Sequence, residues 1–192
     1  PTRRSSDLSI ASLAGTVVIL ALSTFIVKLA SKIGKKELSM IGCFISAASF
    51  ILLFIIHTHN VLVWVGLIIV ATIGTSMFNM VIWAMITDVI DESEVQTGVR
   101  QDGTIYSVYS FARKLGQACS SGLSGVLLSI IGYTSVTAFD PKVVDGIYNI
   151  TCLVPAGGMI LLLLALWFLY PLNKKRVEEN AEKLRIKRNE NA

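Results

Sequence analysis

The sequence predicts an all-α integral membrane protein with about five membrane-spanning helices. Hydrophobic residues make up 53% of the 192 residues. Charged residues make up only 16%, against roughly a quarter in an average soluble domain. Several stretches without a charged residue are 20 residues or longer. About 20 apolar residues are enough for a helix to cross a bilayer, so these stretches predict transmembrane helices.

The boundaries of the predicted spans follow from the uncharged stretches. The first stretch predicts a span over about residues 8–30. The stretch 38–87 is too long for one span, and the polar run at 57–60 divides it into spans 38–56 and 61–87. Later in the chain, a stretch with no charged residue other than Arg113 and Lys114 predicts span 104–131, and an uncharged stretch predicts span 146–170. We expect residues 1–7 to be a non-native or disordered lead, and residues 171–192 to be a charged tail that lies in water as a frayed helix.

Basic residues gather on one side of these spans. Four lysines end the first span, Arg100 follows the third and seven basic residues lie in the tail, which together are twelve of the 17 lysines and arginines. Short loops rich in lysine and arginine stay in the cytoplasm. We therefore expect a multi-pass protein of the cell (plasma or inner) membrane with a cytoplasmic C-terminus. The net charge of +4 then reflects topology and predicts no nucleic-acid partner.

A lysine lies where the fourth span should be most apolar. Lys114 is ten residues into the stretch 104–131. At about 1.5 Å per helical residue it is roughly 15 Å deep, near the midplane of a ~30 Å hydrocarbon core. A charge at that depth is costly and usually faces a cavity, a pathway or a counter-ion. Lys114 is therefore the leading candidate for a binding residue, with a structural ion pair as the alternative. The adjacent Arg113 points about 100° away, and for it a functional and a structural role both stay open.

Acidic residues recur at regular spacing after the third span. Asp88, Asp91 and Glu94 are three residues apart, so they form one stripe if the helix continues. Like charges on one stripe repel unless cations face them. The cations predicted on the same side of the membrane are Arg100, Lys32, Lys35 and Lys36. We interpret this set as a conformational gate, whose contacts exist in only one state of the protein. A solvated charged loop is the alternative.

The spacing of these residues resembles that of a known family. Trp83, Asp88, Asp91, Glu94, Thr97-Gly98, Arg100, Tyr106-Ser107, Phe111 and Lys114 follow the pattern of the tenth and eleventh helices of the glycoside-pentoside-hexuronide cation symporters. This is the melibiose and glucuronide carrier family of the major facilitator superfamily. The remaining spans fit helices eight, nine and twelve. The resemblance therefore implies helices 8–12 of a twelve-helix fold, in a fragment of its C-terminal half.

The resemblance also implies a function. In this family a sugar, glycoside or hexuronide crosses the membrane together with Na⁺ or H⁺ by alternating access. The family's coupling acids lie in its second and fourth helices, so we expect the cation in an N-terminal six-helix half that would be this chain's partner, together with the lipid bilayer. The alternative is a structural or regulatory membrane subunit that transports nothing. We expect no cofactor, no metal site and no enzymatic activity, because no nucleophile and base have catalytic spacing.

The lysine that matches Lys114 belongs to the sugar site of this family. Helical spacing places Ser110, Phe111 and Gln117 on the same face as Lys114, where they could bind sugar hydroxyls and the apolar face of the ring. In span three, Asn79 and Trp83 are four residues apart and are weaker candidates for the same site. For Ser110, Gln117 and Asn79 the alternative is hydrogen bonding between helices. For Trp83 it is anchoring at the membrane interface.

The segment between the first two spans carries a second, shorter resemblance. Residues 31–36 are similar to the basic superfamily loop between helices eight and nine. That loop usually has an acidic residue where this chain has Ser31. The lysines of the loop are therefore expected to pair with Asp88, Asp91 or Glu94 instead.

Overall fold

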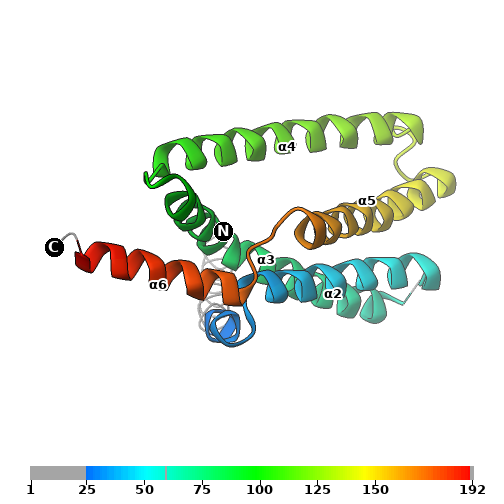
Figure 1. The fold of residues 1–192 in the computed structure, drawn as a ribbon. Helices are drawn as coiled ribbons and strands as arrows, with labels where there is room; N and C mark the ends of the chain where they lie inside the picture. The colour runs from blue at the N-terminus through cyan, green and yellow to red at the C-terminus, as the bar shows by residue number, and fades with distance from the viewer. Residues whose placement is uncertain (1–24, 59, 191–192) are drawn as a thin grey trace, which may run out of the picture.

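The structure, a computed structural model, describes residues 25–58 and 60–190. Within these ranges it contains helices joined by turns and no strand. After helical residues 25–33 come α2 (Lys35–Ile56), α3 (Val61–Thr97), α4 (Asp102–Ile130), α5 (Pro141–Phe168) and α6 (Lys174–Glu190), as Figure 1 shows. The all-α prediction is confirmed. The predicted lead 1–7 and most of the predicted span 8–30 lie outside the described residues.

Three of the described helices are long and apolar enough to cross a membrane. By length and composition these are α2, α3 and α5. The helix α4 is also long, with 29 residues, but the two charges of Arg113 and Lys114 and many small polar residues make it less apolar. The helix α3 runs past the predicted end of its span at residue 87 and continues to Thr97, so the acidic stripe is helical.

The core of the fold forms where α2 packs against both α3 and α5. Its buried side chains include Leu38, Cys43, Val81, Met85 and Leu166. Two glycines bring α2 and α3 together, because a Cβ atom added to Gly42 would lie 2.5 Å from the carbonyl oxygen of Gly74. Small residues at such a crossing let helix backbones approach closely in membrane proteins.

A glycine elbow connects helical residues 25–33 to α2. Gly34 has φ of 120°, in a region that residues with a side chain rarely adopt. The chain therefore turns at Gly34, and Lys32 and Lys35 lie on either side of the turn. This elbow sets the position of Lys35 at the first residue of α2.

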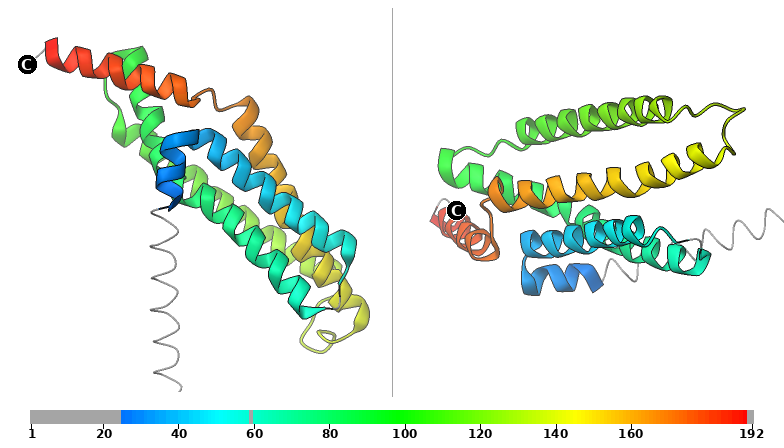
Figure 2. Two further views of the ribbon diagram at one scale, coloured as in Figure 1. Left: turned by 90° about the horizontal axis from the view of Figure 1, so that it is seen from below. Right: turned by 90° about the vertical axis from the view of Figure 1, so that its right-hand side faces the viewer.

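The helix α4 lies at the edge of the group of helices that this chain forms. None of its residues is buried, and its main contact with another helix is with α3. In Figure 1 and in the right-hand view of Figure 2 it runs apart from α2. A long helix that carries two cations in its middle thus has most of its surface uncovered within the described part of the chain.

The C-terminal helix α6 differs from the frayed helix in water that the sequence led us to expect. It packs against the end of α3, and Leu184 and Asn180 are each only 4% exposed. Leu172, just before the helix, is 3% exposed. The expectation was wrong because it rested on the charges of the tail, whereas α6 is held by contacts with α3, which is distant in the chain.

Candidate functional site

The helices α3 and α4 form a groove with a volume of about 540 Å³. Asn79 and Trp83 are four residues apart on α3, and Tyr109 and Arg113 are four residues apart on α4, so each pair shares one face of its helix. The lining residues are Phe78, Asn79, Ile82, Trp83, Tyr109, Ala112 and Arg113. The groove thus combines aromatic surface with an amide, a phenol and a guanidinium group.

Trp83 organises the polar side of this groove. The guanidinium carbon of Arg113 lies over its ring, 5.8 Å from the ring centroid. A cation within about 6 Å of an aromatic centroid is attracted by the ring. Tyr109 meets the same indole edge-on, with the two ring centroids 5.5 Å apart. Trp83 therefore holds both α4 side chains in place.

The substrate-binding residues predicted from the sequence are divided between two regions. Asn79 and Trp83 line the groove. Lys114, Ser110, Phe111 and Gln117 do not line it, and all four α4 residues lie outside the buried part of the fold. Within the described ranges, Lys114 has no ion pair or hydrogen bond with another side chain. Because successive helical residues are about 100° apart, the groove receives Arg113 and leaves Lys114 on a different face of α4.

Two polar residues of the groove were not among the predicted substrate-binding residues. They are Tyr109 and Arg113, and for Arg113 the sequence had left a functional role open. A signal for both was present, because they repeat on α4 the four-residue spacing that Asn79 and Trp83 have on α3. The predicted face of α4 was centred on Lys114 alone, and this choice excluded them.

Asp88, the first residue of the acidic stripe on α3, forms an ion pair with Lys35 of α2. The Nζ atom of Lys35 lies 2.6 Å from Oδ1 of Asp88. Asp88 is only 5% exposed, whereas the Lys35 side chain is 32% exposed, so the pair joins α2 to α3 with its carboxylate buried and its lysine partly in contact with solvent. The expected pairing between the lysines of the 31–36 loop and the stripe is therefore present for Lys35. Lys36 instead donates to the backbone oxygen of Tyr170, at 2.5 Å. Lys32 uses its backbone oxygen to accept a hydrogen bond from Lys174, at 2.9 Å.

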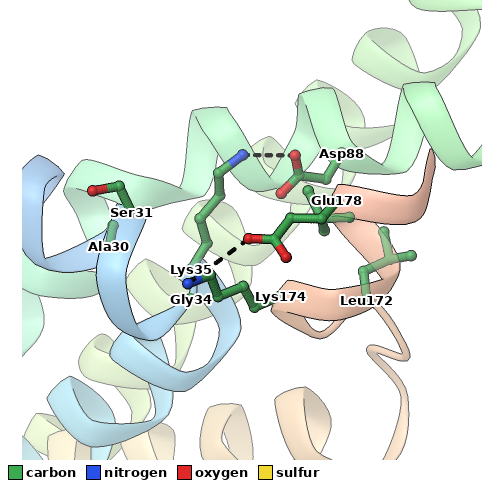
Figure 3. Close-up of a pocket in the computed structure, with 9 residues that line it drawn as sticks. Ala30, Ser31, Gly34, Lys35, Asp88, Leu172, Lys174 and Glu178 are labelled. Carbon is green, nitrogen blue, oxygen red and sulfur yellow. Dashed lines mark hydrogen bonds and ion pairs between the residues drawn. The ribbon is translucent and has the colours of Figure 1, made fainter. Parts of the chain in front are cut away.

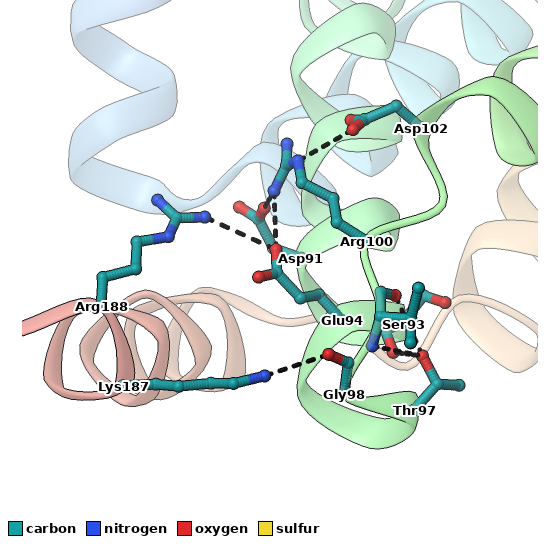
Figure 4. Close-up of polar contacts among 10 residues, drawn as sticks. Asp91, Ser93, Glu94, Thr97, Gly98, Arg100, Asp102, Lys187 and Arg188 are labelled. Carbon is teal, nitrogen blue, oxygen red and sulfur yellow. Dashed lines mark hydrogen bonds and ion pairs between the residues drawn. The ribbon is translucent and has the colours of Figure 1, made fainter. Parts of the chain in front are cut away.

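Arg100 completes the acidic stripe at its far end (Figure 4). Its guanidinium group lies 2.8 Å from Asp91 and 2.9 Å from Glu94, and its Nε atom is 2.9 Å from Asp102. Asp91 and Glu94 raise the pKa of Arg100 above its already high ordinary value, so the side chain stays charged. One arginine thus neutralises two members of the stripe and fixes the loop between α3 and α4.

A further acid, Glu92, was not predicted as part of this cluster. It accepts hydrogen bonds from Arg176, from Asn180 at 2.5 Å and from Gln96 at 2.6 Å. The first two of these donors belong to α6. Glu92 is four residues after Asp88, a spacing that also places two residues on one helix face, whereas the predicted stripe rested only on the three-residue repeat.

Two more bonds tie α6 to the end of α3. Arg188 lies 3.5 Å from Glu94, which it shares with Arg100. The Nζ atom of Lys187 donates to the backbone oxygen of Gly98 at 3.1 Å (Figure 4). The acidic end of α3 is therefore covered by residues of both the following loop and the C-terminal helix.

A small cavity adjoins the Lys35–Asp88 pair (Figure 3). Its volume is about 120 Å³, and Lys174 and Glu178 of α6 line it together with the pair. The second carboxylate oxygen of Asp88 is buried and accepts no hydrogen bond from the described residues. The carboxylate of Asp88, the most buried residue of the charged cluster, can therefore accept a further hydrogen bond.

Comparison with known proteins identifies the class to which this chain belongs. A family model described as MFS/sugar transport protein matches residues 3–174. The chain therefore belongs to this family of membrane transport proteins, and the relatives below agree with the glycoside-pentoside-hexuronide resemblance.

The relatives are named as carriers, symporters and importers. The chain is 33% identical over 168 residues to the glucuronide carrier protein homolog of Escherichia coli (strain K12), with 88% of this chain and 36% of that protein covered. It is 38% identical over 152 residues to the uncharacterized symporter YjmB of Bacillus subtilis (strain 168), with 79% of this chain and 33% of that protein covered. It is 33% identical over 156 residues to the putative sulfoquinovose importer of Salmonella typhimurium, with 79% of this chain and 33% of that protein covered. The chain spans about a third of the length of these curated relatives.

Proposed function

We propose that this chain belongs to the C-terminal half of a cation-coupled sugar transporter that works by alternating access. The observation that carries the proposal is the pair of cations, Arg113 and Lys114, in the middle of α4, where Arg113 lines the aromatic and polar groove between α3 and α4. Transporter sites lie near the membrane midplane between structural repeats. An enzyme is a poorer explanation, since the relatives are named as transporters.

The proposed substrate is a sugar, a glycoside or a hexuronide. Relatives are named for glucuronide, for sulfoquinovose and for glycoside with cation, which supports this range. The lysine ammonium group offers three donors to sugar hydroxyls and adds charge attraction toward an acidic sugar. Na⁺ or H⁺ would be held by the N-terminal half, with which this chain would form the complete carrier.

In this proposal the exposed face of α4 is directed at that N-terminal half. Lys114 would contact the sugar there, with Ser110, Phe111 and Gln117 beside it. Asn79 and Trp83 would contribute from α3. The exposure of all four α4 residues supports this arrangement, because a substrate site between two halves is open when one half is absent.

The charged cluster would act as the gate of the carrier. The guanidinium group of Arg100 is taken up by Asp91, Glu94 and Asp102, so we assign the cluster a role other than sugar binding. We place this end in the cytoplasm, together with α6 and the C-terminus, because most lysines and arginines of the chain lie there. The pairs at Asp88, Asp91 and Glu94 would hold this end closed in one state and separate in the other.

Uptake by the full-length protein tests the proposal. Cells or proteoliposomes that contain it should accumulate a radiolabelled sugar or uronate, and the uptake should depend on a gradient of Na⁺ or H⁺. Uptake of none of a panel of hexoses, glycosides and hexuronides under either gradient would favour the alternative, a structural or regulatory subunit without transport of its own.

A further inference from the structure

We infer that Arg113 makes the groove between α3 and α4 selective for sugars that carry an anionic group, such as the carboxylate of a hexuronide. This inference rests on the proposed function and narrows its substrate class. It assigns the discrimination between acidic and neutral sugars to Arg113, one residue before the lysine proposed to contact the sugar.

The charge of Arg113 is not balanced by the residues around it. The seven residues that line the groove include no aspartate or glutamate. Within the described ranges, Arg113 forms no ion pair. The contrast with other arginines is clear, because Arg100 and Arg176 each bond to a carboxylate at the charged end of the molecule. A cation without a counter-ion, placed in the middle of a membrane-protein helix, is costly unless a ligand or a partner supplies the opposite charge.

Trp83 holds the guanidinium group in a position that suits an anion. The Arg113 guanidinium carbon lies over the indole, 5.8 Å from the centroid. A guanidinium group on an aromatic face keeps the N–H donors in its own plane available. Those donors match the two oxygens of a carboxylate, which is the geometry of the strongest arginine contacts. The indole therefore attracts the cation to this side of the groove, while no described side chain accepts a hydrogen bond from its N–H donors.

The rest of the groove suits the body of a sugar. Tyr109 and Trp83 supply aromatic surface, and Asn79 supplies an amide that donates and accepts hydrogen bonds. The volume of about 540 Å³ lies within the usual range of roughly 300–1,000 Å³ for small-molecule sites. An acidic sugar can thus place its ring against the aromatic side chains and its carboxylate against Arg113.

Lys114 adds a second positive charge at almost the same depth. Arg113 and Lys114 are the twelfth and thirteenth residues of a 29-residue helix, so both lie in its middle third. They point in directions about 100° apart. A ligand between the faces of these two residues would feel both charges, whereas a neutral sugar would gain only hydrogen bonds from them.

The experiment compares two pairs of sugars that differ only at C6, in binding to the full-length protein. The probes are 4-nitrophenyl β-D-glucuronide with the matching glucoside, and 4-nitrophenyl β-D-galacturonide with the matching galactoside. The parent should bind a uronide at least about ten-fold more tightly than its neutral partner. In Arg113→Gln the uronide affinity should fall about ten- to hundred-fold, and the affinity for the neutral glycoside should change less than about three-fold.

Two variants serve as controls in this comparison. Arg185→Gln removes an exposed arginine of α6, far from the groove, and should leave both affinities at the parent values. Arg113→Lys keeps the charge but loses the planar pair of donors, so it should retain part of the preference for the uronide. If Arg113→Gln does not fold, Arg113→Lys decides the question through the same ratio of affinities.

Three results would overturn the inference. If the parent protein binds uronides and neutral glycosides equally well, it has no preference for acidic sugars that Arg113 could cause. An equal loss of both affinities in Arg113→Gln would show that Arg113 does not distinguish acidic from neutral sugars. An Arg113→Lys variant with the full preference of the parent would contradict the assignment of this preference to the paired N–H donors of the Arg113 guanidinium group. A parent that binds none of the four probes would contradict the proposed function itself, which separates that failure from the failure of this inference.

Discussion

Lys35 at the first residue of α2 and Asp88 on α3 form a partly buried ion pair, with Nζ of Lys35 2.6 Å from Oδ1 of the buried Asp88. The two residues are 53 positions apart, and the pair holds α2 against the end of α3 that also carries Asp91, Glu92 and Glu94. Removal of one partner from such a pair leaves the other charge unbalanced in a poorly solvated place. The pair is therefore the most sensitive position at which to test whether the charged cluster acts as a gate.

The first prediction concerns Asp88→Asn in the full-length protein. The substitution leaves Lys35 without its carboxylate and should weaken closure of this end by about 1–3 kcal/mol, the usual range of coupling energies. Labelling of a cysteine introduced on the cytoplasmic side of the cavity should rise, and the transport rate should change more than outward-side sugar affinity. Asp140→Asn, an exposed acid at the start of α5, is the matched control and should change neither. If cysteine labelling and the transport rate of Asp88→Asn both equal those of the parent, the charged cluster is only a solvated loop and does not act as a gate.

The second prediction concerns the attachment of α6. Glu92→Gln removes the charge that binds Arg176 and weakens the bond to Asn180. Hydrogen bonds to charged groups contribute about 1.5–3 kcal/mol, so amide hydrogen exchange in α6 should become at least about ten-fold faster. Glu182→Gln, an exposed acid of the same helix, should leave exchange unchanged. Equal protection of α6 in both variants would mean that the apolar contacts of Leu172 and Leu184 hold the helix without Glu92.

The third prediction concerns the crossing of α2 and α3. A Cβ atom on Gly42 would lie 2.5 Å from the Gly74 oxygen and 2.9 Å from Cβ of Met77, so Gly42→Ala must push the helices apart. Overpacking of this kind costs about 1–3 kcal/mol, which thermal unfolding of the purified full-length protein should detect as a lower midpoint. Gly66→Ala, earlier on α3, has open space around the added Cβ and should be neutral or slightly stabilising. An unchanged midpoint in Gly42→Ala would contradict the close approach of the two helices.

The sequence predicted the helices better than it predicted their faces. Uncharged stretches located α2 and α3 because exclusion of charge is a property of the chain itself. The pairing of Lys35 with the stripe was also predictable, because the sequence placed basic and acidic residues on the same side of the membrane, where they attract one another. The grouping of Arg113 with Trp83 was missed, because the predicted face of α4 was centred on Lys114 and the four-residue spacing of Tyr109 and Arg113 was not used. The position of α6 depends on Glu92 and on two leucines whose partners are distant in the chain, and no local pattern contains that information.

Equilibrium sugar binding to Lys114→Ala in the full-length protein tests the central claim most directly. The proposal places a sugar against this ammonium group, whose charge no acid balances among the described residues. Binding of the parent's preferred sugar should therefore fall by about ten-fold or more, while the variant inserts into the membrane and unfolds at the same temperature as the parent. Lys142→Ala, at the exposed start of α5, should bind like the parent. An affinity of Lys114→Ala equal to that of the parent would contradict the proposed site.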